Sequence, residues 1–175
     1  MKMIKTVMAG AVAMALVSFG ANAAGNNANQ GQGIVNFKGT VIDAPCGIAP
    51  ESADQSIDFG QISKSHLNAD GISVKKDLNI KLVNCEPNKS VKVTFTGATL
   101  EGDNTALGTA GDTGTAVVIS GQDGKLVQFG SEGAAQSLKE GDNTLHYSSW
   151  VKAASKGSAK EGAFTAVANF NLTYN

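Results

Sequence analysis

Few side chains in this sequence have the types and spacing that chemistry requires. His66 and His146 are about 80 positions apart, and neither has a partner at the spacing of a metal site or a general-base pair. No serine lies in the glycine-flanked context of a nucleophile elbow. Asp103, Asp112 and Asp123 lie in glycine-rich stretches, but without the spacing of an EF-hand or a calcium-binding repeat. We therefore expect no catalytic residue, no metal site, no cofactor and no enzyme activity.

The first 23 residues have the features of a secretory signal peptide. Lys2 and Lys5 give a positive start, residues 7–19 form an apolar run, and Ala21-Asn22-Ala23 matches an Ala-x-Ala cleavage site. The apolar run is shorter than the roughly 20 residues of a membrane-spanning helix, and no stop-transfer pattern follows, which argues against a retained anchor. We predict that residues 1–23 are removed and that the protein is exported.

Two cysteines, Cys46 and Cys85, remain after this cleavage. In an oxidising compartment an even pair favours one disulfide, and a bonded cysteine is not available as a nucleophile. Two free thiols or half of a metal site are the alternatives. The sequence has no second cysteine pair and no clustered histidines to support zinc.

The composition fits a single domain without a nucleic-acid surface. The 175 residues are 42% hydrophobic, with 21 glycines and 3 prolines. All 14 basic residues are lysines, and the net charge is −1, or −3 once Lys2 and Lys5 are removed (12 lysines against 15 acids). Basic clusters and arginine forks, which nucleic-acid partners require, are absent from the sequence.

The last stretch, residues 162–175, has the clearest structural pattern. Its apolar side chains fall on one parity, with Val167 as the exception on the other; they are Phe164, Ala166, Ala168, Phe170, Leu172 and Tyr174. A period of two predicts a half-buried β-strand. A strand this apolar on one face needs neighbours on both sides, because a free edge is a template for pairing with another chain.

The rest of the chain also predicts short strands joined by turns. Runs with strand character occur at 56–62, 77–85, 91–95, 115–120, 125–129 and 144–153. Residues 97–114 are expected to form a long loop or a weakly paired edge, and Gly121-Gln122-Asp123-Gly124 is a hairpin signal. No stretch has convincing helical periodicity, so we expect a sandwich or barrel of the immunoglobulin size class.

The segment before Cys46 allows two interpretations. Residues 24–32 are rich in glycine, asparagine and glutamine, and the run 33–43 then alternates, with Gly33, Val35, Phe37 and Gly39 on one parity. Residues 33–43 could be one continuous first strand. Alternatively, residues 24–37 are a detachable arm and the domain is 38–175.

Taken together, these motifs resemble those of a pilin subunit of the chaperone–usher (type 1 and P-type) fimbrial family. The resemblance spans essentially the whole mature chain and rests on the order and spacing of several features. They are Gly33-x-Val35-x-Phe37-Lys38-Gly39, Ala44-Pro45-Cys46, Ile57-x-Phe59-Gly60, Asn84-Cys85, Asn143-Thr144-Leu145-x-Tyr147, Gly162 fourteenth from the end and the penultimate Tyr174. The chain is most similar to a major, polymerising shaft subunit, because it lacks the extra receptor-binding domain of two-domain tip adhesins.

The resemblance implies an all-β, incomplete immunoglobulin-like sandwich of six strands whose seventh strand is donated by a neighbouring subunit. It implies donor-strand positions at Gly31, Gly33, Val35 and Phe37. It also implies an acceptor groove, contacted by a chaperone before assembly, that is formed by Gly162, Phe164, Phe170, Leu172, Tyr174 and Asn175. Head-to-tail strand exchange would then build an adhesive homopolymer on the cell surface.

The resemblance also implies other partners. A periplasmic chaperone would hold the free subunit and grip the carboxylate of Asn175, an outer-membrane usher would exchange chaperone for arm, and minor pilins or a tip adhesin would complete the fibre. Three alternatives stay open: a minor adaptor pilin, a secreted monomeric lectin-like module for which Trp150 is a conceivable platform, and a β-sandwich enzyme.

Overall fold

The structure, a computed structural model, describes residues 33–175, and its compact domain begins at Val41. The expected signal peptide and residues 24–32 lie outside the described residues. The strands are β1 (Gly47–Ile48), β2 (Lys76–Cys85), β3 (Ser90–Gly97), β4 (Thr99–Leu100), β5 (Asp103–Gly108), β6 (Thr115–Gly121), β7 (Gln136–Ser137), β8 (Gly141–Ala153) and β9 (Ala168–Tyr174), and the helices are α1 (Pro50–Ala53) and α2 (Lys64–Asn68).

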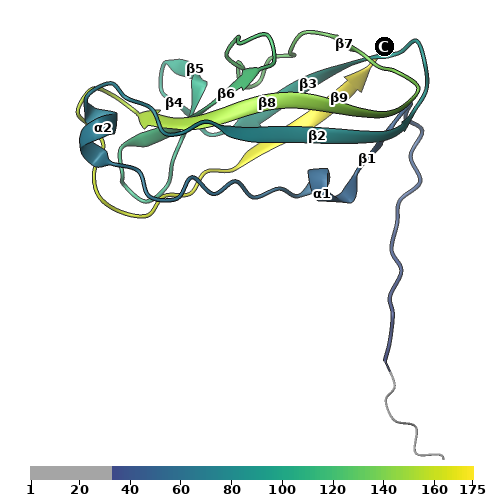
Figure 1. The fold of residues 1–175 in the computed structure, drawn as a ribbon, viewed down its shortest axis with the longest axis horizontal. Helices are drawn as coiled ribbons and strands as arrows, with labels where there is room; N and C mark the ends of the chain where they lie inside the picture. Colours follow the sequence, from purple (N-terminus) through teal and green to yellow (C-terminus); the bar gives the residue numbers. More distant parts are fainter. Residues whose placement is uncertain (1–32) are drawn as a thin grey trace, which may run out of the picture. The chain divides into compact units, whose positions relative to one another are not determined.

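The strands form two antiparallel sheets (Figure 1). The larger sheet has the order β1-β2-β8-β6-β5-β4, and the smaller sheet has the order β7-β3-β9. Six of the strands in residues 33–175 contain six or more residues, and the other three contain only two. This confirms the expected all-β architecture with six principal strands.

The core lies between the inner faces of the two sheets. The strand predicted at 144–153 is confirmed as part of β8, and its side chains alternate: Leu145, Tyr147 and Val151 are buried, whereas Trp150 is on the outer face. Trp150 packs beside a small outer cluster around Val118, and Lys75 Nζ lies 4.4 Å from its ring centroid. Trp150 is therefore a packing residue with a cation–π partner and not an open platform.

Several predicted strands are shorter than expected or do not form. The closing strand begins at Ala168 and not at Gly162, and residues 125–129 contribute only a bridge from Leu126 to Ser120. Residues 33–43 and 56–62 form no strand at all, because no other segment among the described residues pairs with their backbones. A period-two pattern predicts which side chains share a face, but a strand also needs a hydrogen-bonded neighbour.

Other elements were not predicted from the sequence. Residues 97–114, expected as a loop or weak edge, contain β4 and β5. The helices α1 and α2 contain only four and five residues, too few to display a 3.6-residue period. The start of α2 does carry a capping signal, because the Ser63 side chain accepts a hydrogen bond from the His66 N–H at 3.4 Å.

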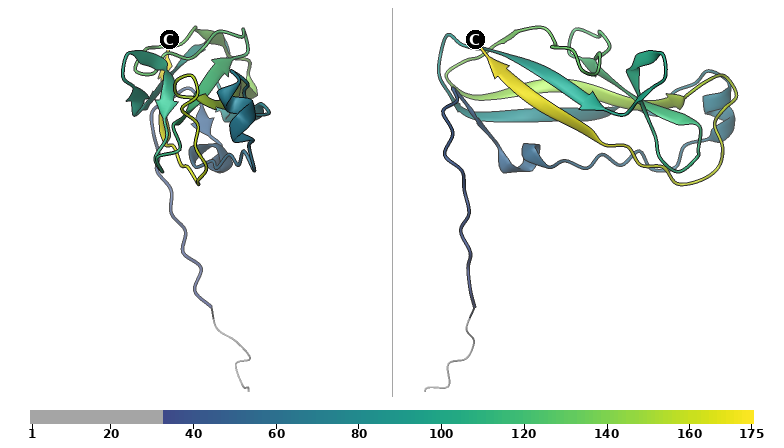
Figure 2. Two further views of the ribbon diagram at one scale, coloured as in Figure 1. Left: turned by 90° about the vertical axis from the view of Figure 1, so that its left-hand side faces the viewer. Right: turned by 180° about the vertical axis from the view of Figure 1, so that it is seen from behind.

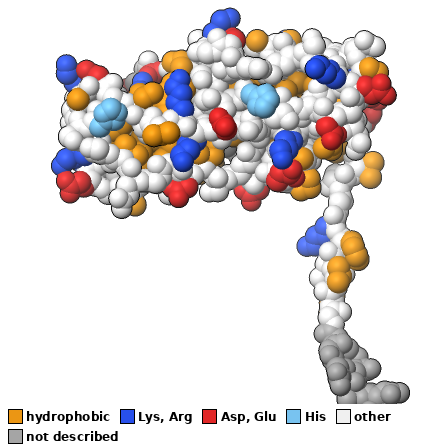
Figure 3. Space-filling model, viewed as in Figure 1, with side chains coloured by type: hydrophobic (Ala, Val, Ile, Leu, Met, Phe, Trp, Pro, Cys, Tyr) orange, Lys and Arg blue, Asp and Glu red, His pale blue; other side chains and the backbone are white. Residues whose placement is uncertain are grey.

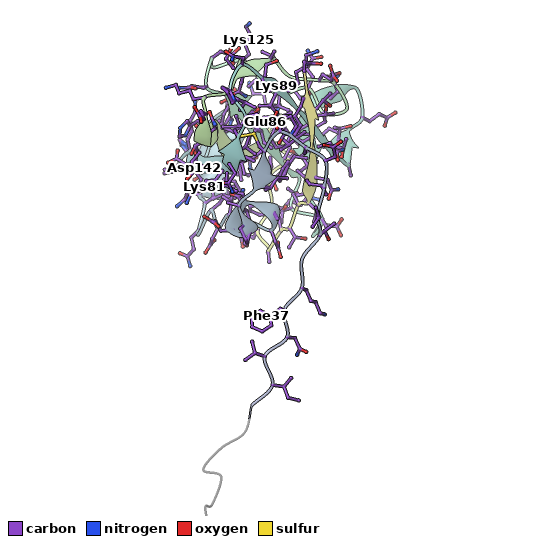
Figure 4. All side chains as sticks on the ribbon, turned by 90° about the vertical axis from the view of Figure 1, so that its right-hand side faces the viewer. Phe37, Lys81, Glu86, Lys89, Lys125 and Asp142 are labelled. Carbon is purple, nitrogen blue, oxygen red and sulfur yellow. A yellow bond between two sulfur atoms is a disulfide. The ribbon has the colours of Figure 1, made fainter. Side chains whose placement is uncertain are left out.

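The predicted disulfide between Cys46 and Cys85 is confirmed (Figure 4), with the two Cα atoms 4.2 Å apart. Both cysteines are buried, and Cys85 ends β2. The Glu86 N–H donates to the Pro45 carbonyl at 2.9 Å, which joins the same two segments beside the disulfide. The disulfide therefore links the start of the compact domain to β2, which pairs with β8, the longest strand among the described residues.

We expect that removing the disulfide by Cys46→Ala with Cys85→Ala lowers the free energy of unfolding by about 4 kcal/mol, because the bond closes a loop of 39 residues in the unfolded chain. Urea unfolding of the mature chain, followed by near-ultraviolet circular dichroism, measures this loss. The reduced wild-type chain is the control and should unfold at the same midpoint as the double variant. An unchanged midpoint in both would contradict the assignment.

Candidate functional site

Strand β9 pairs on one side only. Its partner is β3, and the ladder runs from Gly97 opposite Ala168 to Val91 opposite Tyr174. Asn175 and Ser90 exchange two backbone hydrogen bonds of 3.0 Å, so the residues that exchange bonds with β3 are the odd-numbered ones. The backbone N–H and C=O groups of Phe170, Leu172 and Tyr174 therefore point away from β3. Figure 2 shows β3 on one side of β9 and no strand on the other.

The other three sheet edges in the described part of the chain are short. The larger sheet ends in β1 and β4 and the smaller sheet ends in β7, and each of these strands has two residues. Short edge strands are a common protection against pairing with other chains. The seven-residue edge of β9 lacks this protection.

The core is also open along β9. Val91, Val93 and Phe95 of β3 are at most 2% exposed. Their direct partners on β9, which face the same core, are only half-buried; they are Tyr174, Leu172 and Phe170. Because the two strands are in register on the same layer, this difference comes from the missing cover on the outer side of β9.

A second unpaired segment, residues 54–62, contributes side chains to the same part of the core. Ile57, Phe59 and Ile62 are half-buried, and the Phe59 and Phe164 rings are 6.5 Å apart. No backbone–backbone hydrogen bond among residues 33–175 involves residues 54–62. We call the free edge of β9 together with this segment the acceptor edge.

The chain before β9 brings Phe164 beside Phe59 of the acceptor edge, whereas Gly162 lies beside Thr113. Gly162 has φ of +148°, and a Cβ there would lie 3.2 Å from Thr113 Cγ2, so the position favours glycine. The Asn68 side chain exchanges hydrogen bonds of 3.0 and 2.8 Å with the backbone of Ala159. Thr165 then bridges to Ala110, which guides the chain toward β9.

The hydroxyl of Tyr174 is buried and has no hydrogen-bond partner among the described residues. Burial raises the pKa of this phenol. The Tyr147 hydroxyl offers a contrast: burial also raises its pKa, but it accepts a hydrogen bond from Gln136 Nε2 at 3.1 Å. The apolar ring of Tyr174 is thus well placed in the core, whereas its polar atom is not.

We expect Tyr174→Phe to leave the free energy of unfolding unchanged or to raise it by about 1 kcal/mol, because it removes a buried group that lacks a partner. Tyr147→Phe is the matched control and should lower stability by about 1 kcal/mol, since it deletes a made hydrogen bond. Urea titrations of both variants give the comparison. A clear loss of stability in Tyr174→Phe would show that its hydroxyl is bonded.

The same two phenols predict a response to alkaline pH. Burial raises the folded-state pKa values of both phenols. The stability linked to their protonation is therefore fully present below the unfolded pKa of about 10, and it is lost as the pH rises through the folded pKa values. The midpoint of unfolding is expected to fall above about pH 10. Each phenylalanine variant should lose part of that dependence relative to wild type, and identical profiles would refute it.

Residues 33–42 are extended and exposed, and nearly all of their apolar side chains are free. Val35 is 73% exposed, Phe37 91% and Val41 101%; Ile34 on the opposite parity is 89% exposed. Figure 4 shows the Phe37 side chain projecting from this extended segment, and Figure 3 shows hydrophobic side chains on its surface. Val41 was not among the predicted donor-strand residues. It continues the parity of Gly33, Val35, Phe37 and Gly39, a signal that was present in the sequence. Gly31 lies outside the described residues.

Nothing in residues 33–175 suggests catalysis or metal binding. His146 Nδ1 lies 2.8 Å from Asn79 Oδ1 and His66 Nε2 lies 3.1 Å from the Ile72 carbonyl oxygen, so each imidazole has a local structural contact. No group of three metal-ligating side chains occurs in this part of the chain.

Basic and acidic side chains alternate over the face in Figure 3. No helix in residues 33–175 is long and apolar enough to cross a bilayer.

Comparison with known proteins places these features in context. The model of the Fimbrial protein family matches residues 35–175. The Pap fimbrial major pilin protein of Escherichia coli is 54% identical over 98% of this chain and 100% of its own, and the Major MR/P fimbria protein of Proteus mirabilis is 41% identical over 84% of this chain and 86% of its own. The crystal structure of the P pilus rod subunit PapA is 51% identical, with a TM-score of 0.71 over 75% of this chain and 100% of that one.

Proposed function

Since the chain belongs to the Fimbrial protein family and is a structural subunit of a surface fibre, not an enzyme, we propose that it polymerises by lending residues 33–41 to the acceptor edge of the next copy. The fold and the structural role agree with what the sequence predicted. The new element is the assignment of the donor residues 33–41 and of the acceptor edge. The high identity to major pilins favours a shaft subunit over a minor adaptor.

The observation that carries the proposal is the unequal burial of two paired strands. On β3, Val91, Val93 and Phe95 are buried in the core. Their cross-strand partners on β9 are only half-buried, and the backbone groups beside them are unpaired among the described residues; these partners are Tyr174, Leu172 and Phe170. One extended segment laid along β9 would satisfy both deficits at once. It would supply main-chain hydrogen bonds and cover the apolar row.

The arm has the chemistry that this position requires. Burying an exposed Val or Phe side chain stabilises a complex by about 1.5–3 kcal/mol, and Val35, Phe37 and Val41 are all available on one parity. Gly33 and Gly39 alternate with them, and glycine suits places where a wall comes close. Nine residues of strand span about 30 Å, enough to cover the seven residues of β9 at about 24 Å.

This geometry leads to a fibre. The surface that gives (the arm) differs from the surface that receives (the acceptor edge), so the contact is head-to-tail and does not close into a ring. Each added subunit again offers one free arm or one free edge. Minor pilins or a tip adhesin would end or begin such a chain by the same contact.

We also propose that the free subunit requires a chaperone before assembly. An open edge of seven residues with a half-buried apolar row is prone to aggregation. A periplasmic chaperone that lends its own strand and binds the Asn175 carboxylate would protect it, and an outer-membrane usher would exchange that strand for an arm. Residues 1–23 would direct the chain into this route.

Deleting residues 24–38 should give a subunit that a chaperone still holds but that cannot extend a fibre, because its own acceptor edge is intact and six of the nine donated residues, 33–38, are missing. Electron microscopy of surface shear fractions, together with ladders that resist SDS and collapse on boiling, measures assembly. Fibres of normal length from this variant would refute the proposal.

Point changes test the parity of the arm. Phe37→Ala should weaken strand exchange about 10- to 150-fold, from the loss of 1.5–3 kcal/mol, whereas Lys38→Ala on the other face should have little effect. Exchange of a labelled arm peptide into the chaperone-bound subunit gives the affinities. Equal effects of the two changes would contradict the assigned face.

The length of the donated strand has its own test. Val41→Thr keeps the shape of the side chain but buries a hydroxyl, at a cost of about 1–3 kcal/mol or roughly 5- to 150-fold in affinity. Ile42→Thr, which alters the opposite parity, is the control. If Val41→Thr behaves like Ile42→Thr, the donated strand ends before residue 41.

A further inference from the structure

One edge of β2 lies beside the segment that leads into the acceptor edge. Strand β1 pairs with β2 only at Val83 and Leu82, so residues 76–81 of β2 have no strand on that side among the described residues. The Lys81 carbonyl accepts the Ala49 N–H at 3.0 Å, so the odd-numbered residues of β2 direct their backbone groups to this side. Figure 1 shows the chain running along β2 here, from α1 to α2, without forming a strand.

Two side chains, and not a backbone ladder, join this segment to β2. The Ser52 side chain is only 2% exposed, and its Oγ accepts the Lys81 N–H at 2.9 Å. Gln55 Nε2 donates to the Asn79 carbonyl at 2.9 Å and to the Ser52 carbonyl at 3.2 Å. The Lys81 N–H and the Asn79 C=O are thus bonded by side chains at positions where a neighbouring strand would use its own backbone groups.

These bonds keep residues 56–62 out of the larger sheet. Backbones in a ladder are about 4.7–4.9 Å apart. The Gln55 amide is separated from its own backbone by two methylene groups, so a bond made through this amide leaves the backbone farther from β2. Phe59 packs instead against Phe164, which precedes β9, with the ring centroids 6.5 Å apart. No backbone–backbone hydrogen bond within residues 33–175 involves residues 56–62.

From this arrangement we propose that Ser52 and Gln55 are positioning residues for strand exchange. They bond to β2 through their side chains, so residues 56–62 do not pair with β2 and keep their backbone N–H and C=O groups for the donated arm. The inference rests on the proposed function, because it assigns residues 56–62 as the second neighbour of the arm, on the side opposite β9. Ser52 and Gln55 act through residues 56–62 and not on the arm itself.

Uptake of a labelled arm peptide (residues 33–41) by the chaperone-bound mature subunit tests this role. Gln55→Ala and Ser52→Ala should each weaken uptake about 3- to 10-fold, the effect of one hydrogen bond. Gln55→Glu should behave like Gln55→Ala, because a carboxylate has the same shape as the amide but cannot donate to the Asn79 carbonyl. Full uptake by Gln55→Glu would overturn the inference.

Ser73 provides a matched control. Its side chain is 7% exposed, and its Oγ accepts the Val151 N–H at 2.9 Å, so it makes the same kind of bond as Ser52 but to β8. Ser73→Ala should lower the midpoint of urea unfolding about as much as Ser52→Ala and leave peptide uptake unchanged. Equal losses of uptake in the two variants would mean that Ser52 contributes only general stability, which would also overturn the inference.

Hydrogen exchange on purified fimbriae reports on the segment directly. In wild-type fimbriae the amides of residues 56–62 should be protected, and Gln55→Glu should raise their exchange rates about 3- to 10-fold while Ser73→Ala leaves them unchanged. Unprotected amides at 56–62 in wild-type fimbriae would contradict the assigned pairing.

Failure of this inference and failure of strand exchange give different results. If the wild-type subunit takes up no arm peptide, the proposed function fails and this inference fails with it. If wild type and the variants of Ser52 and Gln55 take up the peptide equally, strand exchange stands and only the role of these two residues is wrong.

Discussion

The structure depends on the absence of a paired strand beside β9, at the edge of the smaller sheet, among the described residues. Backbone groups on the outer side of β9 have no partner in the described part of the chain, and the side chains beneath them are half-exposed although their neighbours on β3 are sealed. A hydrogen-bond ladder and an apolar core are therefore incomplete along the same line. Both deficits have one solution, an added extended segment, because strands supply main-chain bonds and alternate side chains together.

The remaining architecture confines this opening to one place. The disulfide and the bond from Glu86 to Pro45 fasten the start of the domain, and the two-residue strands β1, β4 and β7 end the other edges. The Asn68 side chain holds the backbone of Ala159 on the way to β9, and Gly162 takes a backbone conformation that favours glycine. A subunit that polymerises in one direction needs this asymmetry, since a second long edge would permit branching or aggregation.

The same deficit explains the two segments that form no strand. Residues 33–43 and 56–62 have strand-like sequences, yet neither pairs with another segment within residues 33–175. In the proposed fibre the first would lie between β9 and the second of another copy, and both would then have partners.

Much of this protein was determined by local pattern. The period-two alternation in β9 identified the core-facing side chains, the even pair of cysteines in an exported chain indicated the disulfide, and the spacing of several motifs identified the family. These features depend on neighbours along the chain or on composition, which a single sequence displays directly. The helices α1 and α2 were missed because four or five residues are too few to show a helical period.

Only the tertiary structure decided which strands lack a neighbour. The alternation of Phe170, Leu172 and Tyr174 is the same whether one or two strands flank them, and the pattern at Ile57 and Phe59 reads as a strand whether or not anything pairs with it. Likewise, no local pattern brings the side chains of Ser52 and Gln55 to the backbone of β2. Pairing and exposure arise from contacts between residues far apart in the chain, and the physical reason they were not readable is that alternation records a side chain's face but not what covers it.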